Sequence, residues 1–477
     1  MRIIEDKALL LKLRNPNRVT KTVPKSKAVR DNEVLVNWGI DEMHALHALN
    51  IDVPSPIHGQ YTWTGKYDPF AHQKKTAAFL TMNKKSFCFN EQGTGKTASA
   101  IWATDYLMKQ GKIKRALVIC PLSIMDSAWR EDLFTFAPHR TVDIAHGVSK
   151  KRKAIIEQGA DFVIINYDGV EIVSEEIAKG GFDLIIVDEA THYKNAQSKR
   201  WKILNKLVNE DTWLWMMVMR KVTQFRWIVK PEATDLVFNV LQPAIRFTKE
   251  ECLDLPDMTY VKRKVELTRQ QQKYYNLLKK KLTMKIHEDE VSAVNAAVVM
   301  NKLLQISAGA VYTDEGDTLE FDIKHRYKVL REVIDESSQK VLVFVPFKHT
   351  IDILTDKLRS DGITTEVIRG DVPVAKRTDI FKRFQTTSDP RVLVIQPQSA
   401  AHGVTLTAAN TVVWWGPTPS LETYAQANAR VHRSGQKHPC TVVQLQGSAA
   451  EKRVYALLDN RIDVHTKMID LYKELLD

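Results

Sequence analysis

The sequence is poor in cysteine and has no long apolar run. Only Cys88, Cys120, Cys252 and Cys440 occur among 477 residues, and no two of them form a Cys-x-x-Cys pair. This spacing argues against a disulfide framework or a zinc site and favours a reducing compartment. A membrane-spanning helix needs about 20 predominantly apolar residues, and the sequence has no such run. The first residues also lack the apolar core of a signal peptide, so we expect a cytoplasmic protein with no membrane partner.

Acidic residues are fewer than basic ones. The chain has 69 lysines and arginines against 57 aspartates and glutamates, which gives a formal net charge of +12. This balance indicates a polyanionic partner such as DNA or RNA, which charge alone does not distinguish. Basic residues cluster at 21–30, 150–153 and 279–281, and each cluster taken alone is typical of a solvated surface. With 44% hydrophobic residues, the chain can build the cores of two or three domains.

A run that begins at Asn90, Asn-Glu-Gln-Gly-Thr-Gly-Lys-Thr, has the pattern of a phosphate-binding loop between a strand and a helix. Gly93 and Gly95 allow the backbone to curl so that several N–H groups point at one phosphate. Lys96 adds a positive charge for the β- and γ-phosphates, and the Thr97 hydroxyl can bind Mg²⁺. A glycine-rich turn before an ordinary helix is the alternative interpretation, since the general motif expects glycine where Asn90 stands.

A second motif consists of two adjacent carboxylates after a strand. The apolar run 184–187, which follows Asp183, leads directly into Asp188 and Glu189. Hydrolysis of Mg·ATP requires such a pair, because Asp188 can hold the metal together with Thr97 while Glu189 orients and deprotonates the attacking water. An acidic pair that caps a surface strand is the alternative. The phosphate-loop pattern and the acidic pair each follow an apolar strand and occur in the order that ATP hydrolases use, which argues against that alternative.

Short apolar runs alternate with helical stretches through most of the chain. They occur at 116–120, 162–165, 184–187 and 213–216, and again at 341–345, 366–368, 392–395, 412–415 and 442–445. Because these runs are continuous rather than alternating, they predict two parallel sheets, each covered by helices on both faces. Residues 269–307, between the two groups, are predicted to be helical. The second group has no phosphate loop of its own, so we expect two lobes that share one nucleotide site.

At this point the chain resembles a known family, the superfamily-two helicases, and specifically the Swi/Snf-type DNA translocases. The resemblance covers roughly residues 65–477 and rests on segments in the family's order: 69–73, 90–97, 120–129, 166–167, 188–195, 403–410 and 426–436. The segment from Gln426, Gln-Ala-Asn-Ala-Arg-Val-His-Arg-Ser-Gly-Gln, is especially close to the family's motif. The chain is similar to small phage-encoded members, which implies a bacterial cell or a phage-infected host as its location.

The resemblance implies an α/β fold with two RecA-like parallel-sheet lobes in tandem, a helical insertion and a small N-terminal accessory segment. We expect a basic accessory segment at 1–60, the first lobe at 61–257, a helical linker at 258–325, and the second lobe with a C-terminal helix at 326–477. The first lobe would carry the phosphate loop and the acidic motif, and the second lobe would carry the arginines.

The resemblance also implies a role for each motif residue. ATP would be bound by Gln73, on the adenine edge, and by Gly93, Thr94, Gly95, Lys96 and Thr97. The catalytic residues would be Lys96, Asp188, Glu189, Arg430 and Arg433, with Mg²⁺ on Thr97 and Asp188. Candidates for contact with DNA are Ser123, Trp129, Asn166, Gly403 and Thr405. On a helix, Gln426, Arg430 and Arg433 would share one face, so that the two guanidiniums act as arginine fingers.

These assignments predict a DNA-stimulated ATP hydrolase of the helicase type. It would couple hydrolysis to translocation on, or remodelling of, duplex or branched DNA, with ATP as substrate and Mg²⁺ as cofactor. Contacts with phosphates rather than base edges predict low sequence specificity. A strand-separating DNA or RNA helicase is the alternative within the class, and a nucleotide-switched DNA-binding scaffold with weak turnover is the alternative outside it. One chain holds both halves of the ATP site, so a monomer suffices.

The family's Thr-Gly-Thr-Pro segment is the expected motif that the sequence lacks. It should follow the strand at 212–217, but Met217 is followed directly by Val218-Met-Arg-Lys. Three explanations are open: the protein naturally lacks the segment, the segment was removed by engineering, or the sequence omits a stretch between Met217 and Val218. We favour the third explanation. If the molecule lacks the segment, we expect ATP binding to persist and coupling to DNA to weaken, as in the scaffold interpretation.

Overall fold

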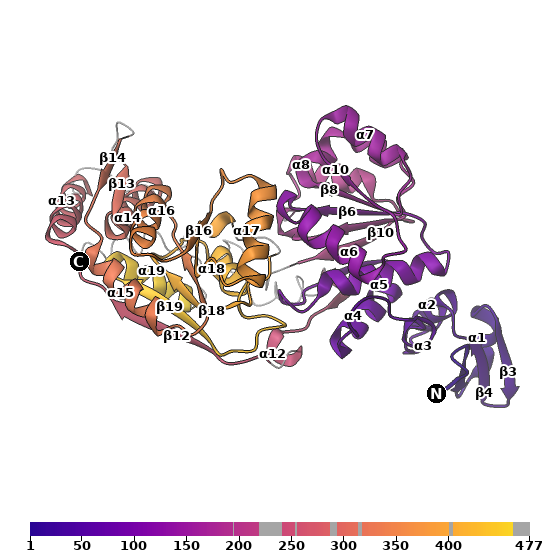
Figure 1. Ribbon diagram of the computed structural model, residues 1–477. Helices are drawn as coiled ribbons and strands as arrows, with labels where there is room; N and C mark the ends of the chain where they lie inside the picture. The colour runs from indigo at the N-terminus through magenta and orange to yellow at the C-terminus, as the bar shows by residue number, and fades with distance from the viewer. Residues whose placement is uncertain are drawn as a thin grey trace. The chain divides into compact units, whose positions relative to one another are not determined.

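The computed structural model describes residues 1–193, 195–218, 241–252, 255–286, 293–312, 317–399 and 404–460. The chain forms two compact units, unit 1 (Met1–Leu253) and unit 2 (Asp254–Asp477). Figure 1 colours them along the chain, with unit 1 from indigo to magenta and unit 2 from pink to yellow. Across the described residues, no helix has both the length and the apolar character needed to cross a bilayer.

A small antiparallel sheet begins unit 1. Its strands are β1 (Arg2–Ile4), β2 (Ala8–Lys12), β3 (Ser26–Arg30) and β4 (Glu33–Asn37), in the order β1-β2-β4-β3. Helix α1 (Pro16–Thr22) lies between β2 and β3 in sequence, and α2 (Ile40–Ala48) and α3 (Ile57–Gln60) follow β4. One face of the sheet is buried against α1 and α2 through Leu9, Leu11, Val34 and Val36. We call residues 1–60 the N-terminal module; the sequence predicted only an accessory segment here.

The main sheet of unit 1 has 7 parallel strands in the order β11-β5-β10-β9-β6-β8-β7. They are β5 (Lys85–Cys88), β6 (Ala116–Cys120), β7 (Val142–Ala145), β8 (Phe162–Asn166), β9 (Leu184–Val187), β10 (Trp213–Met217) and β11 (Ala244–Ile245). The prediction of a parallel sheet is confirmed. The two edge strands, β7 and β11, were not predicted.

Helices cover both faces of this sheet (Figure 1). One face packs against α4 (Ala71–Met82), α5 (Lys96–Lys109) and α6 (Glu131–Phe136), and the other against α7 (Ser149–Glu157), α8 (Tyr167–Ile172), α9 (Ser174–Lys179) and α10 (Lys199–Leu207). The 3-10 helix η1 (Leu122–Ile124) and the π-helix η2 (Met125–Arg130) follow β6, and the 3-10 helix η3 (Ala190–Tyr193) follows β9. Successive strand residues alternate between the two cores, as Val118 and Ile119 do. Both faces are therefore dry, which explains the continuous apolar runs.

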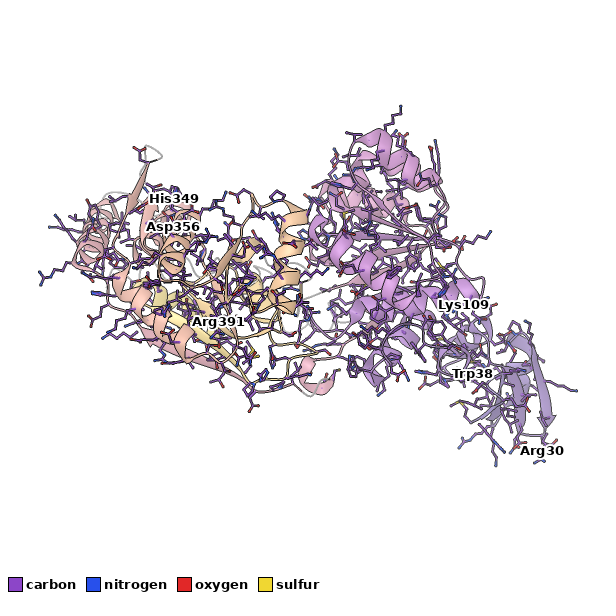
Figure 2. The ribbon with its side chains drawn as sticks, viewed as in Figure 1. Arg30, Trp38, Lys109, His349, Asp356 and Arg391 are labelled. Carbon is purple, nitrogen blue, oxygen red and sulfur yellow. The ribbon has the colours of Figure 1, made fainter. Side chains whose placement is uncertain are left out.

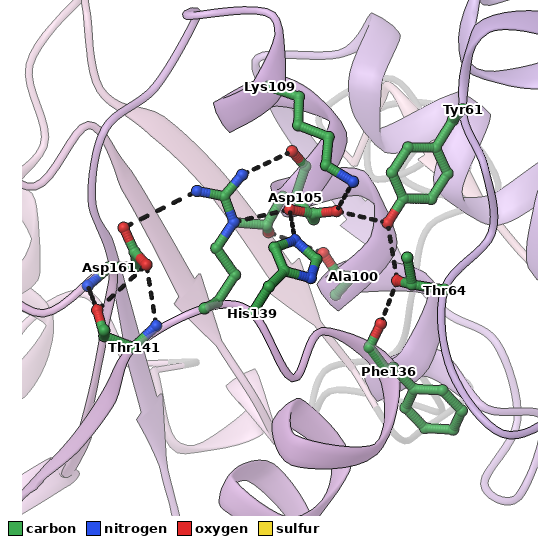
Figure 3. A network of polar contacts seen from close by, with 11 residues as sticks. Tyr61, Thr64, Ala100, Asp105, Lys109, Phe136, His139, Thr141 and Asp161 are labelled. Atoms are coloured by element: carbon green, nitrogen blue, oxygen red, sulfur yellow. Dashed lines mark hydrogen bonds and ion pairs between the residues drawn. The ribbon is translucent and has the colours of Figure 1, made fainter.

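Asp105, on α5, is a fully buried carboxylate that ties several segments of unit 1 together (Figure 3). The Tyr61 hydroxyl donates to it at 2.7 Å, Arg140 Nε donates at 2.7 Å, and His139 Nε2 lies 2.8 Å from it. Lys109, one turn later on α5, forms an ion pair with it at 2.9 Å. Burial alone would raise the pKa of this carboxyl, but the four partners outweigh burial and lower the pKa to about 2.

The sheet of unit 2 has 6 parallel strands in the order β12-β19-β18-β15-β17-β16. They are β12 (Met258–Lys264), β15 (Lys340–Phe344), β16 (Thr365–Ile368), β17 (Val392–Ile395), β18 (Ala409–Trp414) and β19 (Cys440–Gln446). One core includes α14 (Ala293–Ala308), α17 (Val374–Thr386), α18 (Leu421–Asn428) and α19 (Ala449–Asp459), and the other includes α15 (Lys324–Glu336) and α16 (Lys348–Ser360). The short helices α12 (Lys249–Cys252) and η4 (Pro397–Ser399) complete the described elements, apart from those of residues 265–320.

Residues 258–325, which we expected to be helical, are only partly so. Helices α13 (Arg269–Ile286) and α14 agree with the prediction, but β12 is an edge strand, and β13 (Ala310–Tyr312) and β14 (Thr318–Glu320) form a hairpin. The sequence of β12, Met-Thr-Tyr-Val-Lys-Arg-Lys, is polar because an edge strand leaves many side chains in solvent. The predicted domain boundaries stay predictions.

We expect Asp105→Asn to lower the free energy of unfolding by about 2–3 kcal/mol at pH 7, the equivalent of a pKa lowered from 3.8 to about 2. A carboxyl whose pKa is lowered on folding stabilises the folded state above its ordinary pKa. That stabilisation is lost as the pH falls through about 2. In urea unfolding, the deficit of the variant should therefore shrink by about half between pH 7 and pH 3.

Asp161→Asn is the matched control. Asp161 accepts a hydrogen bond from the Thr141 N–H at 2.9 Å, but its side chain is 30% exposed. This substitution should cost less than about 1 kcal/mol. An Asp105→Asn deficit of equal size at both pH values would contradict the role given to the Asp105 carboxylate.

Candidate active site

Two motif-bearing strands end at the same edge of the unit 1 sheet. β5 leads into the phosphate loop and β9 leads into Asp188, and in a parallel sheet the carboxyl ends of all strands lie together. β10 lies between these two strands and pairs with both. The chain leaves β10 at Val218, whose N–H donates to the carbonyl of Cys88 at 2.9 Å. The residues that follow, 219–240, lie outside the described part of the chain.

The phosphate loop curls at its two glycines. Gly93 and Gly95 have φ angles of 87° and 81°, in the left-handed region that favours glycine. Between them, the Thr94 hydroxyl donates to the carbonyl of Glu91 at 2.7 Å. Gly95 is the N-cap of α5, so the positive end of this helix follows the loop directly. The backbone therefore has the curvature and the polarity that an anion site needs.

Two side chains of α4 hold the loop. His72 Nε2 lies 2.8 Å from the carbonyl oxygen of Thr94, and Gln73 Nε2 donates to the same oxygen at 3.3 Å. Gln73 Oε1 accepts the N–H of Phe70 at 3.0 Å. A Cβ atom at Gly95 would come within 2.0 Å of Gln73 Nε2, so Gln73 lies against the loop. Sequence reasoning gave no role to His72, although it directly precedes Gln73.

Lys96 is the buried cation of the loop. It is 7% exposed, and its amine donates to the carbonyls of Asn90 at 2.6 Å and Glu91 at 3.2 Å. Burial lowers the pKa of this amine, whereas the nearby charges of Asp188 and Glu189 act in the opposite direction. The structure therefore brings Lys96 into the electrostatic field of the acidic pair.

Asn90, which departs from the general motif, is a buried bridge. Its side-chain amide donates to Thr76 Oγ1 on α4 at 2.8 Å and accepts the N–H of Phe247 at 3.0 Å. These contacts join the end of β5 to α4 and to the segment after β11. The departure from the motif thus has a structural reason, because an amide can donate and accept at once.

Strand β9 ends in a buried carboxylate pair. Asp188 and Glu189 are 7% and 4% exposed. The N–H of Glu189 donates to Asp188 Oδ1 at 2.9 Å, and Glu189 itself has a φ of 50°, a strained conformation of the kind that concentrates at functional sites. Burial and the neighbouring charge of Glu189 raise the pKa of Asp188, and a bound cation would reverse this shift.

Two aromatic residues position Asp188, and sequence reasoning missed both contacts. Trp129 Nε1 donates to Asp188 Oδ2 at 2.9 Å, and the Tyr167 hydroxyl donates to the carbonyl of Asp188 at 2.6 Å. Trp129 is fully buried, so the predicted contact of its side chain with DNA finds no support. Only the sheet topology could have indicated these two contacts. Both residues follow strands, β6 and β8, whose ends lie at the same sheet edge as Asp188.

The residues at this edge fit ATP with Mg²⁺. Carboxylate and hydroxyl oxygens are the protein ligands that Mg²⁺ prefers, and Asp188 and Thr97, in the first turn of α5, supply one of each. The raised pKa of Asp188 indicates a carboxylate that is short of positive charge. Lys96 and the curled loop supply the complementary charge for phosphates.

The other candidates for contact with DNA differ in their surroundings. Ser123 lies in η1, after β6, and its side chain is not among those described. Asn166 ends β8, and its side-chain oxygen accepts Arg152 Nη1 at 2.9 Å. Arg152 belongs to a basic cluster that we expected to be solvated, yet it is 6% exposed. Gly403 lies outside the described residues, and Thr405, just after that gap, is half-buried.

The helix expected to carry Gln426, Arg430 and Arg433 ends too early. α18 stops at Asn428, so the prediction that the three side chains share one helical face is wrong. Beyond Asn428 the backbone tightens into a turn, in which the Arg430 N–H donates to the carbonyl of Ala427 at 3.1 Å and the Arg430 carbonyl accepts the N–H of Leu406 at 2.9 Å.

Residues 426–436 instead pack against the segment that follows residue 403. Arg433 Nη1 donates to the carbonyl of Val404 at 3.2 Å, and Gln436 Nε2 donates to the carbonyl of Ala409 at 2.9 Å. Arg430 is 1% exposed. Unit 2 therefore brings its two predicted motif segments into direct contact.

We expect Gly95→Ala to disturb the loop and Gly111→Ala to be tolerated better. Both glycines have positive φ angles, 81° and 66°, so the backbone strain on replacement is similar, about 1 kcal/mol. A Cβ atom at Gly95 would overlap Gln73, whereas none of the described atoms lies within 4 Å of one at Gly111. Thermal unfolding and binding of a fluorescent ATP analogue should both show the larger loss for Gly95→Ala. Equal losses would contradict the contact between Gly95 and Gln73.

Comparison with known proteins finds two family models that match the chain. An SNF2-related domain matches residues 72–215, and a helicase conserved C-terminal domain matches residues 325–435. Together the two models cover just over half of the chain. The first lies within unit 1 and the second within unit 2.

Relatives occur in bacteria and in phages. An ATP-dependent helicase of Mycoplasma genitalium is 24% identical over 416 residues, which is 80% of this chain and 40% of that protein. The chain thus spans less than half the length of this relative. A putative protein of Acyrthosiphon pisum secondary endosymbiont phage 1 is 22% identical over 428 residues, which is 76% of this chain and 88% of that protein.

A solved structure is also similar. It is the SWI2/SNF2 ATPase core of Sulfolobus solfataricus in complex with double-stranded DNA, with 22% identity, coverage of 83% of this chain and 92% of that one, and a TM-score of 0.40. The two domain matches follow one another in the order that the sequence motifs predict. The chain belongs to the SNF2-related helicases.

Proposed function

We propose that this chain is a DNA-stimulated ATP hydrolase that couples hydrolysis to translocation on, or remodelling of, duplex or branched DNA. The observation that carries the proposal is the arrangement at one edge of the unit 1 sheet, where a curled loop with a buried lysine lies beside a buried carboxylate pair. Buried titratable groups of opposite charge at a sheet edge are typical of functional sites. Membership of the SNF2-related helicases supports the same reaction.

Each residue of this edge has a distinct task in the proposal. The loop N–H groups, the positive end of α5 and Lys96 bind the phosphates, while Gln73 binds the adenine edge. Thr97 and Asp188 would hold Mg²⁺, which would supply positive charge to neutralise the phosphates. Glu189 orients the attacking water and accepts its proton.

The arginines of unit 2 complete the proposed machinery. Arg430 and Arg433 would stabilise the negative charge that develops on the transferred phosphoryl group, for which a guanidinium is well suited. Their location after α18, rather than on it, means that the turn at 429–436 sets their positions. The role of these two residues stays a prediction.

DNA is the proposed partner because of charge and motif resemblance. The net charge is +12, and the segments around Ser123, Asn166 and Thr405 resemble backbone-contact segments of the Swi/Snf-type family. Contacts with phosphates carry no sequence information by themselves. We therefore propose low sequence specificity.

A scaffold with weak turnover is the second candidate, and one observation favours it. The sequence after β10 is Val218-Met-Arg-Lys in place of Thr-Gly-Thr-Pro. A chain without that segment would retain both strands that carry the ATP-site residues, because β5 and β9 pair with β10 no further than Met217. ATP binding and coupling to DNA are therefore separable in principle.

Duplex DNA is expected to raise the rate of ATP hydrolysis several-fold over the rate without nucleic acid. The measurement compares no nucleic acid, duplex DNA, single-stranded DNA and RNA, with Lys96→Ala as the control. Loss of the lysine should lower every rate by about 100-fold, as removal of a preorganised electrostatic group does.

These four conditions distinguish the candidate functions. Stimulation mainly by single strands or RNA would replace the translocase with a strand-separating helicase. ATP binding without stimulation by any nucleic acid would favour the scaffold and contradict the proposal.

Trp129→Phe should weaken the ATPase through Asp188. The substitution keeps an aromatic ring but removes the N–H that donates to Asp188 Oδ2, a hydrogen bond to a charged group worth about 1.5–3 kcal/mol. This bond lowers the pKa of Asp188, so without it the pKa rises further. The acidic limb of the pH–rate profile should therefore move to higher pH, and the Mg²⁺ concentration needed for half-maximal rate should increase.

Trp102→Phe makes the same chemical change elsewhere in unit 1. Trp102 is 1% exposed, and its Nε1 donates to the carbonyl of Thr64 at 2.8 Å, not to the acidic pair. This variant should lower stability without moving the pH–rate profile. A profile shifted equally in both variants would show a general loss of packing and refute the positioning role of Trp129.

A further inference from the structure

The first half of the N-terminal module carries a concentration of positive charge that the proposed ATP site does not use, while the acidic residues of the module lie mainly in its second half. Its first 30 residues contain nine basic residues, Arg2, Lys7, Lys12, Arg14, Arg18, Lys21, Lys25, Lys27 and Arg30, but only two acidic residues, Glu5 and Asp6. The family models begin at residue 72, so this charge lies outside both matched domains.

The strand register brings several of these basic residues to one face of the sheet. Arg2 pairs with Leu10, Leu10 with Leu35, and Leu35 with Lys27, so these four residues form one row across the strands. Directly paired residues share a face of the sheet. Lys27 and Arg2 therefore lie at opposite ends of a row with two leucines between them.

The next row along the strands adds two more basic residues. Lys12 and Arg30 both pair with Glu33. Lys12 lies two residues from Leu10, and Glu33 two residues from Leu35, so this row is on the same face. We call this surface the basic face, made of Arg2, Lys12, Lys27 and Arg30 around Leu10 and Leu35.

The basic face is the solvent side of the sheet. The opposite face is the one buried against α1 and α2, through Leu9, Leu11, Val34 and Val36. Leu10 and Leu35 are half-exposed, and the four basic residues are exposed. Figure 2 places Arg30 at the far end of the module from Trp38, a core residue.

Most side chains of the basic face form no ion pair within the module. In residues 1–60, all of which are described, the basic face makes one ion pair, between Arg30 and Glu33 at 3.7 Å, and the Arg30 side chain is still 77% exposed. Basic residues on edge strands also discourage aggregation, which accounts for Arg2 on β1 and for Lys27 and Arg30 on β3. That explanation does not extend to Lys12, which lies on the interior strand β2.

The dimensions suit a nucleic-acid backbone. Arg2 and Lys27 are separated by three strand spacings, roughly 14 Å, and the two rows are roughly 7 Å apart. Long flexible side chains at these positions can reach phosphates on either side of a groove that is about 6 or 12 Å wide. Two half-exposed leucines offer little area for a lipid layer or a protein partner, whereas they can contact sugar edges between phosphates.

We propose that the basic face of the N-terminal module binds the phosphate backbone of DNA, as a second contact outside the family domains. This inference rests on the proposed function, because it assumes that DNA is the substrate. The face would hold the duplex through charge and would add affinity without sequence preference.

The test compares two double variants of the full chain that each remove two positive charges from the module. Lys12→Ala/Lys27→Ala alters the basic face, and Arg18→Ala/Lys21→Ala alters exposed positions of α1, on the opposite side of the sheet. The measurement is the dissociation constant of a labelled duplex of about 20 base pairs as a function of salt concentration. Thermal unfolding and ATP hydrolysis without DNA should be unchanged in both variants.

The face variant should bind duplex DNA roughly 10-fold more weakly at low salt, with a salt slope smaller by about 2, because each phosphate contact contributes about 0.9. The α1 variant should change the slope by less than half of that. Equal losses in both variants, or no loss in the face variant while duplex DNA still stimulates the ATPase, would overturn this inference alone. A wild-type chain that binds no DNA would overturn it together with the proposed function. Loss of binding to phosphatidylserine vesicles without loss of DNA affinity would assign the face to a membrane surface instead.

Discussion

The buried carboxylate of Asp188 is the constraint on which the organisation of unit 1 depends. A charge removed from water must be compensated by donors or by opposite charge. Here the indole N–H of Trp129 and the backbone N–H of Glu189 donate to the carboxylate, and the Lys96 amine contributes its charge. These groups come from the segments that follow β5, β6 and β9, so the positions of three strand ends are linked through one side chain. This need for a donor also explains why Trp129, which we expected to contact DNA, is buried instead.

A comparison of two buried aspartates shows how a carboxylate in a functional site differs from one with a structural role. Asp105 has four partners, two of them permanent cations, and its pKa falls to about 2. Asp188 has fewer donors and a carboxylate neighbour, and its pKa is raised. The first carboxylate is saturated and needs no further charge. The second lacks positive charge at a sheet edge, which is the condition for binding a metal and a phosphate rather than for holding helices together.

The sequence predicted the central strands of both sheets and the motif segments, since strands buried on both faces are continuous apolar runs. It did not predict the N-terminal sheet or β12, because short or edge strands bury only alternate residues and resemble polar linkers. It also extended α18 through Arg433, because helical spacing is visible in sequence while the turn after Asn428 and the tertiary hydrogen bond from Leu406 to Arg430 are not. The contact of Trp129 with Asp188 depends on topology, which local patterns do not contain.

The position of β10 gives the absent Thr-Gly-Thr-Pro segment its significance. β10 pairs with β5 on one side and β9 on the other, so whatever follows Met217 begins between Lys96's loop and Asp188. The pairing itself uses only backbone groups, and the residues up to Val218 already satisfy it. The pairing of β10 with β5 and β9 therefore does not depend on the residues directly after Val218, whereas the later segment does contribute to this edge, because β11 pairs with β5 and the Phe247 N–H donates to Asn90 Oδ1 at 3.0 Å.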